Sequence, residues 1–343
     1  MQERFDDWER ERHSLLAHRI SDLGLSLRGT LVERLAQQLY AELDERGLSF
    51  HPPVYLSDQW GCPEEVPLIG VPFYLADPRL ERIEEEMSSD VEGEHDQMKF
   101  LRHEAGHALN YAYRLFERAD WTATFGEFTR PYREHYRVDP LSRRFVRHIL
   151  GWYAQKHPDE DFAETFAVWL TPNLDWRLDY AGWPALAKLE YVDRVMTEVG
   201  REAPAVPAPT EDDLPVEAMR YTVREHYDDS SEQLPIEDER HFDGDLRSVF
   251  ATESESPAGE AAGAFLRRHR RELTTRVSYW SGESAVMTGA FIDLLAKRAD
   301  AQTLRVRGLE SSTLIELTAF GTAVMMNYRY TDALDGSASL SDD

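Results

Sequence analysis

The chain has 343 residues, and its 64 aspartates and glutamates outnumber its 38 lysines and arginines, which gives a formal net charge of −26. This charge argues against binding to nucleic acid phosphates or to anionic membrane surfaces. Hydrophobic residues make up 42%, enough for a sizeable core, but no apolar run is long enough to span a membrane. The acidity agrees with solubility alone or with attraction of a cationic substrate or partner.

Cys62 is the single cysteine, so the chain can form neither an intrachain disulfide nor a thiolate-rich metal site. Any metal ion would be bound through nitrogen and oxygen atoms of histidines and carboxylates. The N-terminus is charged and lacks the apolar segment of a signal peptide, so we expect cytoplasmic residence.

Residues 1–48 are expected to form two helices, the second opened by a capping box of Thr30 and Glu33. Residues 52–56 are typical of a short strand. Residues 66–76 are also β-prone, but their two prolines restrict them to the edge of a sheet. Such an edge either binds an extended peptide by strand addition or is an ordinary edge without a ligand.

The strongest pattern is the H-E-x-x-H sequence from His103 to His107, inside a segment expected to be an amphipathic helix over about residues 96–118. Histidines four residues apart on a helix point in the same direction, so both imidazoles can bind one zinc ion. Glu104 would then face the attacking water as a general base. A catalytic zinc site still needs a third protein ligand.

Two more helices are expected downstream, over about residues 142–153 and over 158–170, the latter with a proline and three acidic residues in its first turn. Residues 211–260 contain sixteen acidic side chains against four basic ones, which predicts a flexible acidic linker over 201–260. Helical patterning returns over 261–279, 285–298 and 313–328, the last with a capping box of Thr313 and Glu316. The expected organisation is therefore a domain over 1–200, the linker, a helical region over 261–330 and a disordered tail over 331–343.

The third zinc ligand has two usual sources. The extended metzincin motif requires a glycine and a histidine where this chain has Asn110 and Tyr113, so that completion fails. The other source is a glutamate on a separate helix. Glu160 and Glu164 lie four residues apart, so Glu160 can bind zinc while Glu164 accepts a hydrogen bond from the far nitrogen of a ligand histidine.

Other carboxylates lie near this pair in the sequence. Glu127 and Glu134 are alternative third ligands. Asp159 and Asp161 are expected only to complement the helix dipole and to face water.

The segment HEAGHALNYAYRLF followed by WYAQKHPDEDFAETFAVWL resembles the glutamate-type zincins, or gluzincins. Within them it resembles the lethal-factor-like group and uncharacterised bacterial proteins classed as zinc-binding metallopeptidases. The resemblance covers about residues 66–175. It implies a predominantly helical α+β fold, with a zincin-like domain that has a small edge-strand sheet and two zinc-ligand helices.

The resemblance also implies zinc-dependent hydrolysis of a peptide bond, with the following roles: His103, His107 and Glu160 as zinc ligands, Glu104 as base, Glu164 as support for a ligand, and Tyr153 as oxyanion donor. Tyr153 could instead be a packed aromatic residue, with His148 or His157 as the donor. His107 and Glu160 are 53 positions apart, so residues 118–150 are expected to form an insertion near the cleft.

The expected partner is a peptide or protein substrate, with neither nucleic acid nor a membrane, and the sequence leaves the oligomeric state open. One alternative is a zinc-binding interaction or regulatory protein that uses the fold without turnover. Glu104 argues against it, because a purely structural zinc site needs no base. A further alternative is a helical scaffold in which the motif is accidental.

Overall fold

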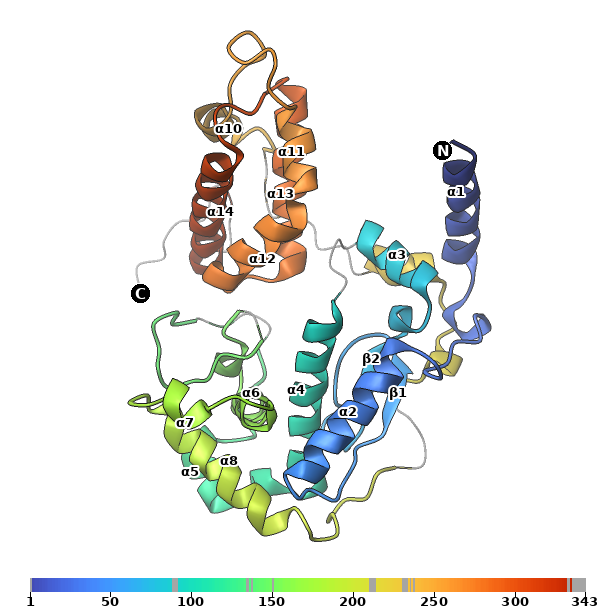
Figure 1. The fold of residues 1–343 in the computed structure, drawn as a ribbon, viewed down its shortest axis with the longest axis vertical. Helices are drawn as coiled ribbons and strands as arrows, with labels where there is room; N and C mark the ends of the chain where they lie inside the picture. Colours follow the sequence, from blue (N-terminus) through green and yellow to red (C-terminus); the bar gives the residue numbers. More distant parts are fainter. Residues whose placement is uncertain are drawn as a thin grey trace. The chain divides into compact units, whose positions relative to one another are not determined.

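The computed structural model describes residues 2–87, 92–133, 136, 138–149, 151–209, 214–229, 234, 236, 238–331 and 334. These residues form two compact units, one up to residue 229 and one from residue 234, each with its own hydrophobic core. Helices dominate both units, and the first also contains a two-stranded sheet (Figure 1). The expected α+β class with predominant helix is confirmed.

The first unit contains these elements in chain order: α1 (Gln2–Ala17), η1 (Ile20–Asp22), α2 (Leu31–Glu45), β1 (Val54–Ser57), β2 (Ile69–Pro72), η2 (Phe73–Ala76), α3 (Pro78–Met87), α4 (Glu94–Ala112), η3 (Leu115–Glu117), α5 (Ala119–Phe125), η4 (Tyr153–Gln155), α6 (Pro158–Leu170), α7 (Trp176–Asp179), α8 (Ala185–Val199), η5 (Val216–Ala218) and α9 (Val223–Asp229). The two helices expected within residues 1–48 are therefore present. Thr30 caps α2 as expected, because its side chain accepts a hydrogen bond from the Glu33 amide at 3.1 Å.

Helix α4 lies between α2 and α6 (Figure 1). A buried ion pair joins α2 to α4, with the Arg102 guanidinium donating twice to the Glu42 carboxylate at 2.7 Å. The contact with α6 is closer, since a Cβ atom on Gly106 would lie 2.8 Å from the Cα atom of Ala163 and 3.1 Å from its carbonyl oxygen. Glycine at this position therefore sets how closely the two helices approach.

The sheet pairs β1 and β2 in parallel, with Val54 opposite Ile69 and Leu56 opposite Val71. The segment around Gly61 covers the other edge of β2, where Gly61 and Gly70 exchange backbone hydrogen bonds of 3.2 and 2.8 Å. One expectation was that an extended peptide adds as a strand to this edge of the sheet. At Gly70, however, the edge of β2 is already paired within the chain.

The motif helix ends at Ala112, earlier than residue 118, because Arg114 adopts a left-handed conformation with φ of 50°. The prediction of a helix over 142–153 is wrong for the described residues, because their backbone is irregular until η4. Their amide groups donate elsewhere: Arg147 to the Tyr180 hydroxyl, and His148 and Ile149 to Glu164. Side-chain acceptors thus replace the carbonyls that a helix would use.

Residues 201–260, expected as a linker, contribute to both units. Val216, Met219 and Val223 are buried in the core of the first unit, while Phe242 and Leu246 are buried in that of the second. Residues 210–213, 230–233, 235 and 237 of the expected linker lie outside the described residues, as does the expected tail except for Thr331 and Leu334.

The second unit contains α10 (Asp243–Val249), α11 (Ala262–Arg268), α12 (Arg270–Ser281), α13 (Ala285–Ala301) and α14 (Glu310–Thr331). The helix expected over 261–279 is divided at His269, and α13 agrees with expectation. Helix α14 begins at Glu310, so the expected capping box at Thr313 is wrong, and the Thr313 hydroxyl donates to the Leu309 carbonyl instead.

Among the helices that the structure describes, none is both long and apolar enough to cross a membrane. The cytoplasmic location stays a prediction.

The approach of α4 to α6 yields a first prediction. Gly106→Ala should lower the free energy of unfolding by about 1–3 kcal/mol, because the added methyl group pushes the two helix backbones apart. The loss would be measured by chemical denaturation of the metal-free protein.

Gly244→Ala is the matched control, since Gly244 lies in helix α10 and an added methyl group there would meet no atom within 4 Å. It should be neutral or slightly stabilising. Equal effects of the two changes would contradict the close approach at Gly106.

Candidate metal centre

Three possible metal ligands converge from two helices. His103 and His107 lie one turn apart on α4, and Glu160 lies in the first turn of α6. The Nε2 atoms of the histidines are 3.1 Å apart, and Glu160 Oε2 lies 3.0 Å from that of His103 and 3.1 Å from that of His107. Within the described ranges, this is the cluster of histidine and acidic side chains that could hold a metal ion.

The donor set fits zinc. A tetrahedral zinc ion bonded at roughly 2.0–2.1 Å separates its ligands by about 3.3 Å, close to the observed triangle. Two imidazole nitrogens and one carboxylate oxygen are a usual set for catalytic zinc, with a fourth position left for water or substrate. All three side chains are buried in the protein interior.

The far nitrogen of His103 is held by Glu164. His103 Nδ1 lies 2.9 Å from Glu164 Oε1, and the other carboxylate oxygen accepts from the amides of His148 and Ile149 at 3.2 and 2.9 Å. Glu164 is fully buried, so these partners fix its position and that of the His103 ring. The arrangement expected for Glu164 is present in the structure.

The far nitrogen of His107 is held by a residue whose role the sequence analysis missed. His107 Nδ1 lies 2.8 Å from Asp159 Oδ2, and Asp159 also accepts from the Tyr111 hydroxyl at 2.6 Å and the Asn110 amide at 2.7 Å. The expectation that Asp159 faces water is wrong, because its side chain is buried. The one available signal was its position beside Glu160.

Asp161 does not face water either. It is buried on another side of α6, and Lys188 of α8 donates to it at 2.5 Å. Burial raises the pKa of Asp161 to about 7, although Lys188 opposes that rise. Asp161 thus connects α6 to α8 rather than serving the metal.

The carboxylates around the histidines decide their protonation. Burial disfavours the charged His103 ring, but hydrogen bonds to Glu160 and Glu164 outweigh burial and raise its pKa to about 9. Burial likewise opposes charge on Glu160, yet the two histidines hold the pKa of this carboxyl well below its ordinary value. Without a metal the cluster therefore retains protons, and a zinc ion would displace them on binding.

Glu104, the expected base, lies in the same cleft as the metal donors. Its side chain is buried but forms no hydrogen bond or ion pair with any residue that the structure describes, and it lines a cleft of about 630 Å³ together with the three metal donors. Burial raises its pKa, an effect that His103 and His107 only partly offset. A raised pKa suits a carboxylate that must accept a proton near neutral pH.

Two tyrosines line the same cleft. The Tyr132 hydroxyl donates to Glu160 Oε1 at 2.5 Å and lies 3.1 Å from the Tyr153 hydroxyl. Since Tyr132 gives its only proton to Glu160, Tyr153 donates to the Tyr132 oxygen. Burial and the charge of Glu160 raise the pKa of Tyr153, so its phenol keeps its proton at neutral pH.

Tyr132 is the second residue that the sequence analysis missed. It comes from the region predicted to be an insertion near the cleft, and Phe128 and Arg130 of that region also line the cleft. No motif marked it, because its position depends on how an irregular segment returns to α6.

The remaining candidates are less well placed. Glu127 is exposed and does not line the cleft, and Glu134 lies outside the described residues. The imidazoles of His148 and His157 bond the backbone carbonyls of Lys99 and Arg130, at 3.0 and 2.7 Å. Of these two, only His157 lines the zinc cleft.

Comparison with known proteins agrees with this geometry. Residues 81–177 match the model of a family described as "Putative zinc-binding metallo-peptidase". The matched segment runs from α3 into α7 and contains the three metal donors, their two carboxylate partners and both tyrosines. No curated protein and no solved structure matches the chain. The similarity supports zinc-dependent peptidase activity, and with the donor set it identifies zinc as the cofactor.

The two carboxylate partners yield a second prediction. Glu164→Gln and Asp159→Asn should each weaken zinc binding by about 10–100-fold, because an amide holds the far nitrogen of a ligand histidine less strongly than a carboxylate does. Zinc affinity would be measured by competition with a chelator of known strength.

Asp161→Asn is the matched control, since it alters a buried carboxylate of the same helix that contacts Lys188 and neither ligand histidine. It should leave zinc affinity unchanged. A loss as large as that of Glu164→Gln would show that the effect comes from α6 as a whole.

Proposed function

We propose that this protein is a zinc-dependent peptidase of the gluzincin type, with His103, His107 and Glu160 as zinc ligands. The observation that carries the proposal is the Glu104 carboxylate, buried in the cleft beside the three donors and without a hydrogen-bond partner among the described residues. A site that only binds zinc has no use for a base there. The gluzincin assignment is supported by a third ligand that comes from a separate helix and by Glu164 one turn further along it.

Zinc bound by these residues supplies Lewis-acid polarisation of the scissile carbonyl and lowers the pKa of the attacking water. Glu104 takes the proton of that water as it attacks the carbonyl carbon, then delivers the proton to the leaving amine. Both of its carboxylate oxygens are available for this transfer. Glu164 and Asp159 keep the two imidazoles oriented throughout.

Tyr153 is proposed to stabilise the tetrahedral intermediate. Its ring lies 5.6 Å from that of His103, and its raised pKa keeps the hydroxyl protonated for donation to the developing oxyanion. The hydroxyl must first turn away from Tyr132, its partner in the present arrangement.

The decisive experiment is Glu104→Gln, which keeps the shape of the side chain but removes the base. We expect one zinc per chain, as in the wild type, and peptide hydrolysis reduced by about 10²–10⁴-fold. Zinc would be measured by atomic absorption and hydrolysis by mass spectrometry of a peptide library.

Glu127→Gln is the control, because it alters an exposed glutamate outside the cleft. If Glu104→Gln hydrolysed peptides at the wild-type rate, Glu104 would not be the base. A wild-type protein that binds zinc but cleaves no peptide would favour the non-catalytic alternative.

Tyr153→Phe should lower kcat by about 10²–10³-fold with little change in KM, since a lost oxyanion donor acts in the transition state. Tyr132→Phe is the comparison variant. It removes the hydrogen bond to Glu160 but leaves the Tyr153 phenol in place, so its effect on kcat should be smaller. If Tyr132→Phe lowered kcat more than Tyr153→Phe does in steady-state kinetics, Tyr132 would be the oxyanion donor instead.

A further inference from the structure

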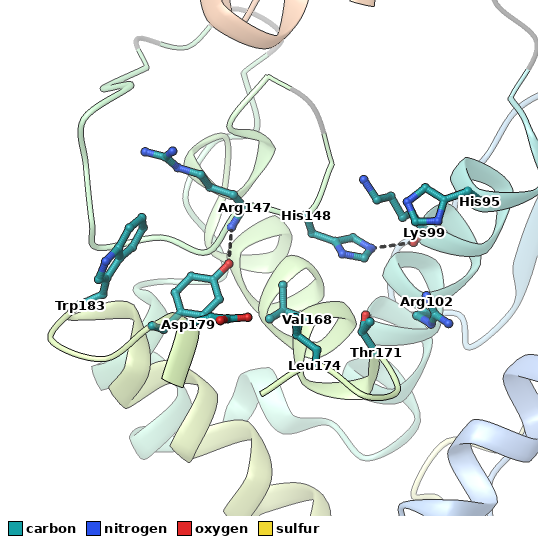
Figure 2. A pocket seen from close by; sticks show the side chains of 11 residues that line it. His95, Lys99, Arg102, Arg147, His148, Val168, Thr171, Leu174, Asp179 and Trp183 are labelled. Carbon is teal, nitrogen blue, oxygen red and sulfur yellow. Dashed lines mark hydrogen bonds between the residues drawn. The ribbon is translucent and has the colours of Figure 1, made fainter. Parts of the chain in front are cut away.

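A second cavity of the first unit lies next to α4 and has no part in the proposed hydrolysis. It measures about 360 Å³ and is lined by residues of α4, of the irregular segment before α6, and of the region from α6 to Trp183 (Figure 2). We call it the basic pocket, because Lys99, Arg102 and Arg147 line it against one carboxylate, Asp179. In a chain of net charge −26, such a collection of cations needs an explanation.

We propose that the basic pocket binds a small organic anion, a molecule with a carboxylate or phosphate head and an apolar body. This site does not depend on the proposed peptidase function. Its volume falls within the range of about 300–1,000 Å³ that is typical of small-molecule sites.

The cations of the pocket have unused hydrogen-bonding capacity. The Lys99 ammonium forms no hydrogen bond or ion pair within the described part of the chain. Arg102 is 7% exposed and donates to Glu42 through Nε and Nη2, which leaves Nη1 without a partner among the described residues. Arg147 donates to the Pro140 carbonyl and approaches the Trp183 ring, but no described carboxylate pairs with it. Arg102 is buried, Lys99 is partly buried and Arg147 is exposed at the rim, and charged donors of this kind form strong hydrogen bonds with an oxyanion.

His148 does not add to the charge of the pocket. Burial lowers its pKa to about 4, so the ring is neutral at physiological pH, and its Nε2 donates to the Lys99 carbonyl at 3.0 Å. The positive potential therefore comes mainly from Lys99 and Arg147, because the charge of Arg102 is compensated by Glu42. Figure 2 shows Lys99 and Arg147 on opposite walls, with His148 between them.

Part of the pocket wall is apolar, because Val168, Leu174 and Trp183 line it. A bare inorganic ion would leave these side chains uncovered, whereas an organic body would bury them. This favours an organic anion over inorganic phosphate.

The pocket is also connected to the metal centre. Arg147 and His148 form part of its wall, and the amides of His148 and Ile149 hold the Glu164 carboxylate that orients His103. A ligand that fixes this segment should therefore strengthen zinc binding, and zinc should strengthen ligand binding by the same factor.

The zinc-loaded full-length protein is titrated calorimetrically with phenyl phosphate, benzoate and inorganic phosphate. Phenyl phosphate or benzoate should bind at one site per chain and more tightly than inorganic phosphate, and the stronger of the two identifies the preferred head group. Binding of neither organic anion, or equal binding of inorganic phosphate, would overturn the proposal.

Variants locate the site. Lys99→Gln and Arg147→Gln should each weaken binding by about tenfold or more, since each removes a charged donor. Lys156→Gln is the matched control, because Lys156 lines the zinc cleft instead. If only Lys156→Gln weakens binding, the anion occupies the zinc cleft and the proposal fails.

The connection to the metal has its own readout. The zinc dissociation constant is measured in the wild type and in Lys99→Gln, with and without the tighter organic anion at a concentration that saturates the wild type but leaves the variant mostly unbound. The ligand should lower the constant in the wild type and lower it much less in Lys99→Gln. An unchanged constant in the wild type would overturn the connection between the two sites.

Discussion

The packing of α4 against α6 is the interaction on which the metal centre depends. Gly106 allows the two backbones to approach so closely that a methyl group would lie 2.8 Å from Ala163. At that separation the first turn of α6 places Glu160 within 3.0–3.1 Å of both imidazoles. The same approach brings Glu164 and Asp159 to the far nitrogens of the histidines. The contact of α4 with α6 therefore sets the distances from Glu160 to both histidines, while the histidine pair is set within α4.

This contact buries several charges together. Glu104, Asp159, Glu160 and Glu164 lie in the interior around two histidines, and removing each carboxylate from water costs several kcal/mol unless partners compensate. Asp159 and Glu164 are compensated by hydrogen bonds from neighbouring side chains and amides, whereas no described residue donates to Glu104. The remaining negative charge favours a divalent cation. Burying these carboxylates therefore destabilises the folded protein, and a bound zinc ion would reduce that destabilisation.

The irregular segment before α6 contributes residues both to the metal centre and to the basic pocket. On one side its amides hold Glu164, and further along it Tyr153 reaches the zinc cleft directly after Trp152, whose φ of 53° is strained for a bulky residue. On the other side Arg147 and His148 line the basic pocket. A regular helix could not do this, because its amides would be paired with its own carbonyls. Because the segment is not helical, its amides are free to bind Glu164 while its side chains line the pocket.

The sequence alone determined the local features: the helices that carry the motif and its third ligand, the Thr30 cap, and the choice of His103, His107 and Glu160, which the structure brings together. The helices, the cap and the pairing of the two histidines follow from periodicity and from spacing within one helix, where neighbours in sequence are neighbours in space. Glu160 was expected from its spacing to Glu164 and from the family resemblance. Tyr132, Asp159 and the basic pocket were decided by the tertiary structure. Tyr132 depends on the path of an irregular segment, Asp159 on the rotation of α6 against α4, and the pocket on side chains from elements far apart in the chain. No local pattern encodes such contacts, because they arise only when the helices pack.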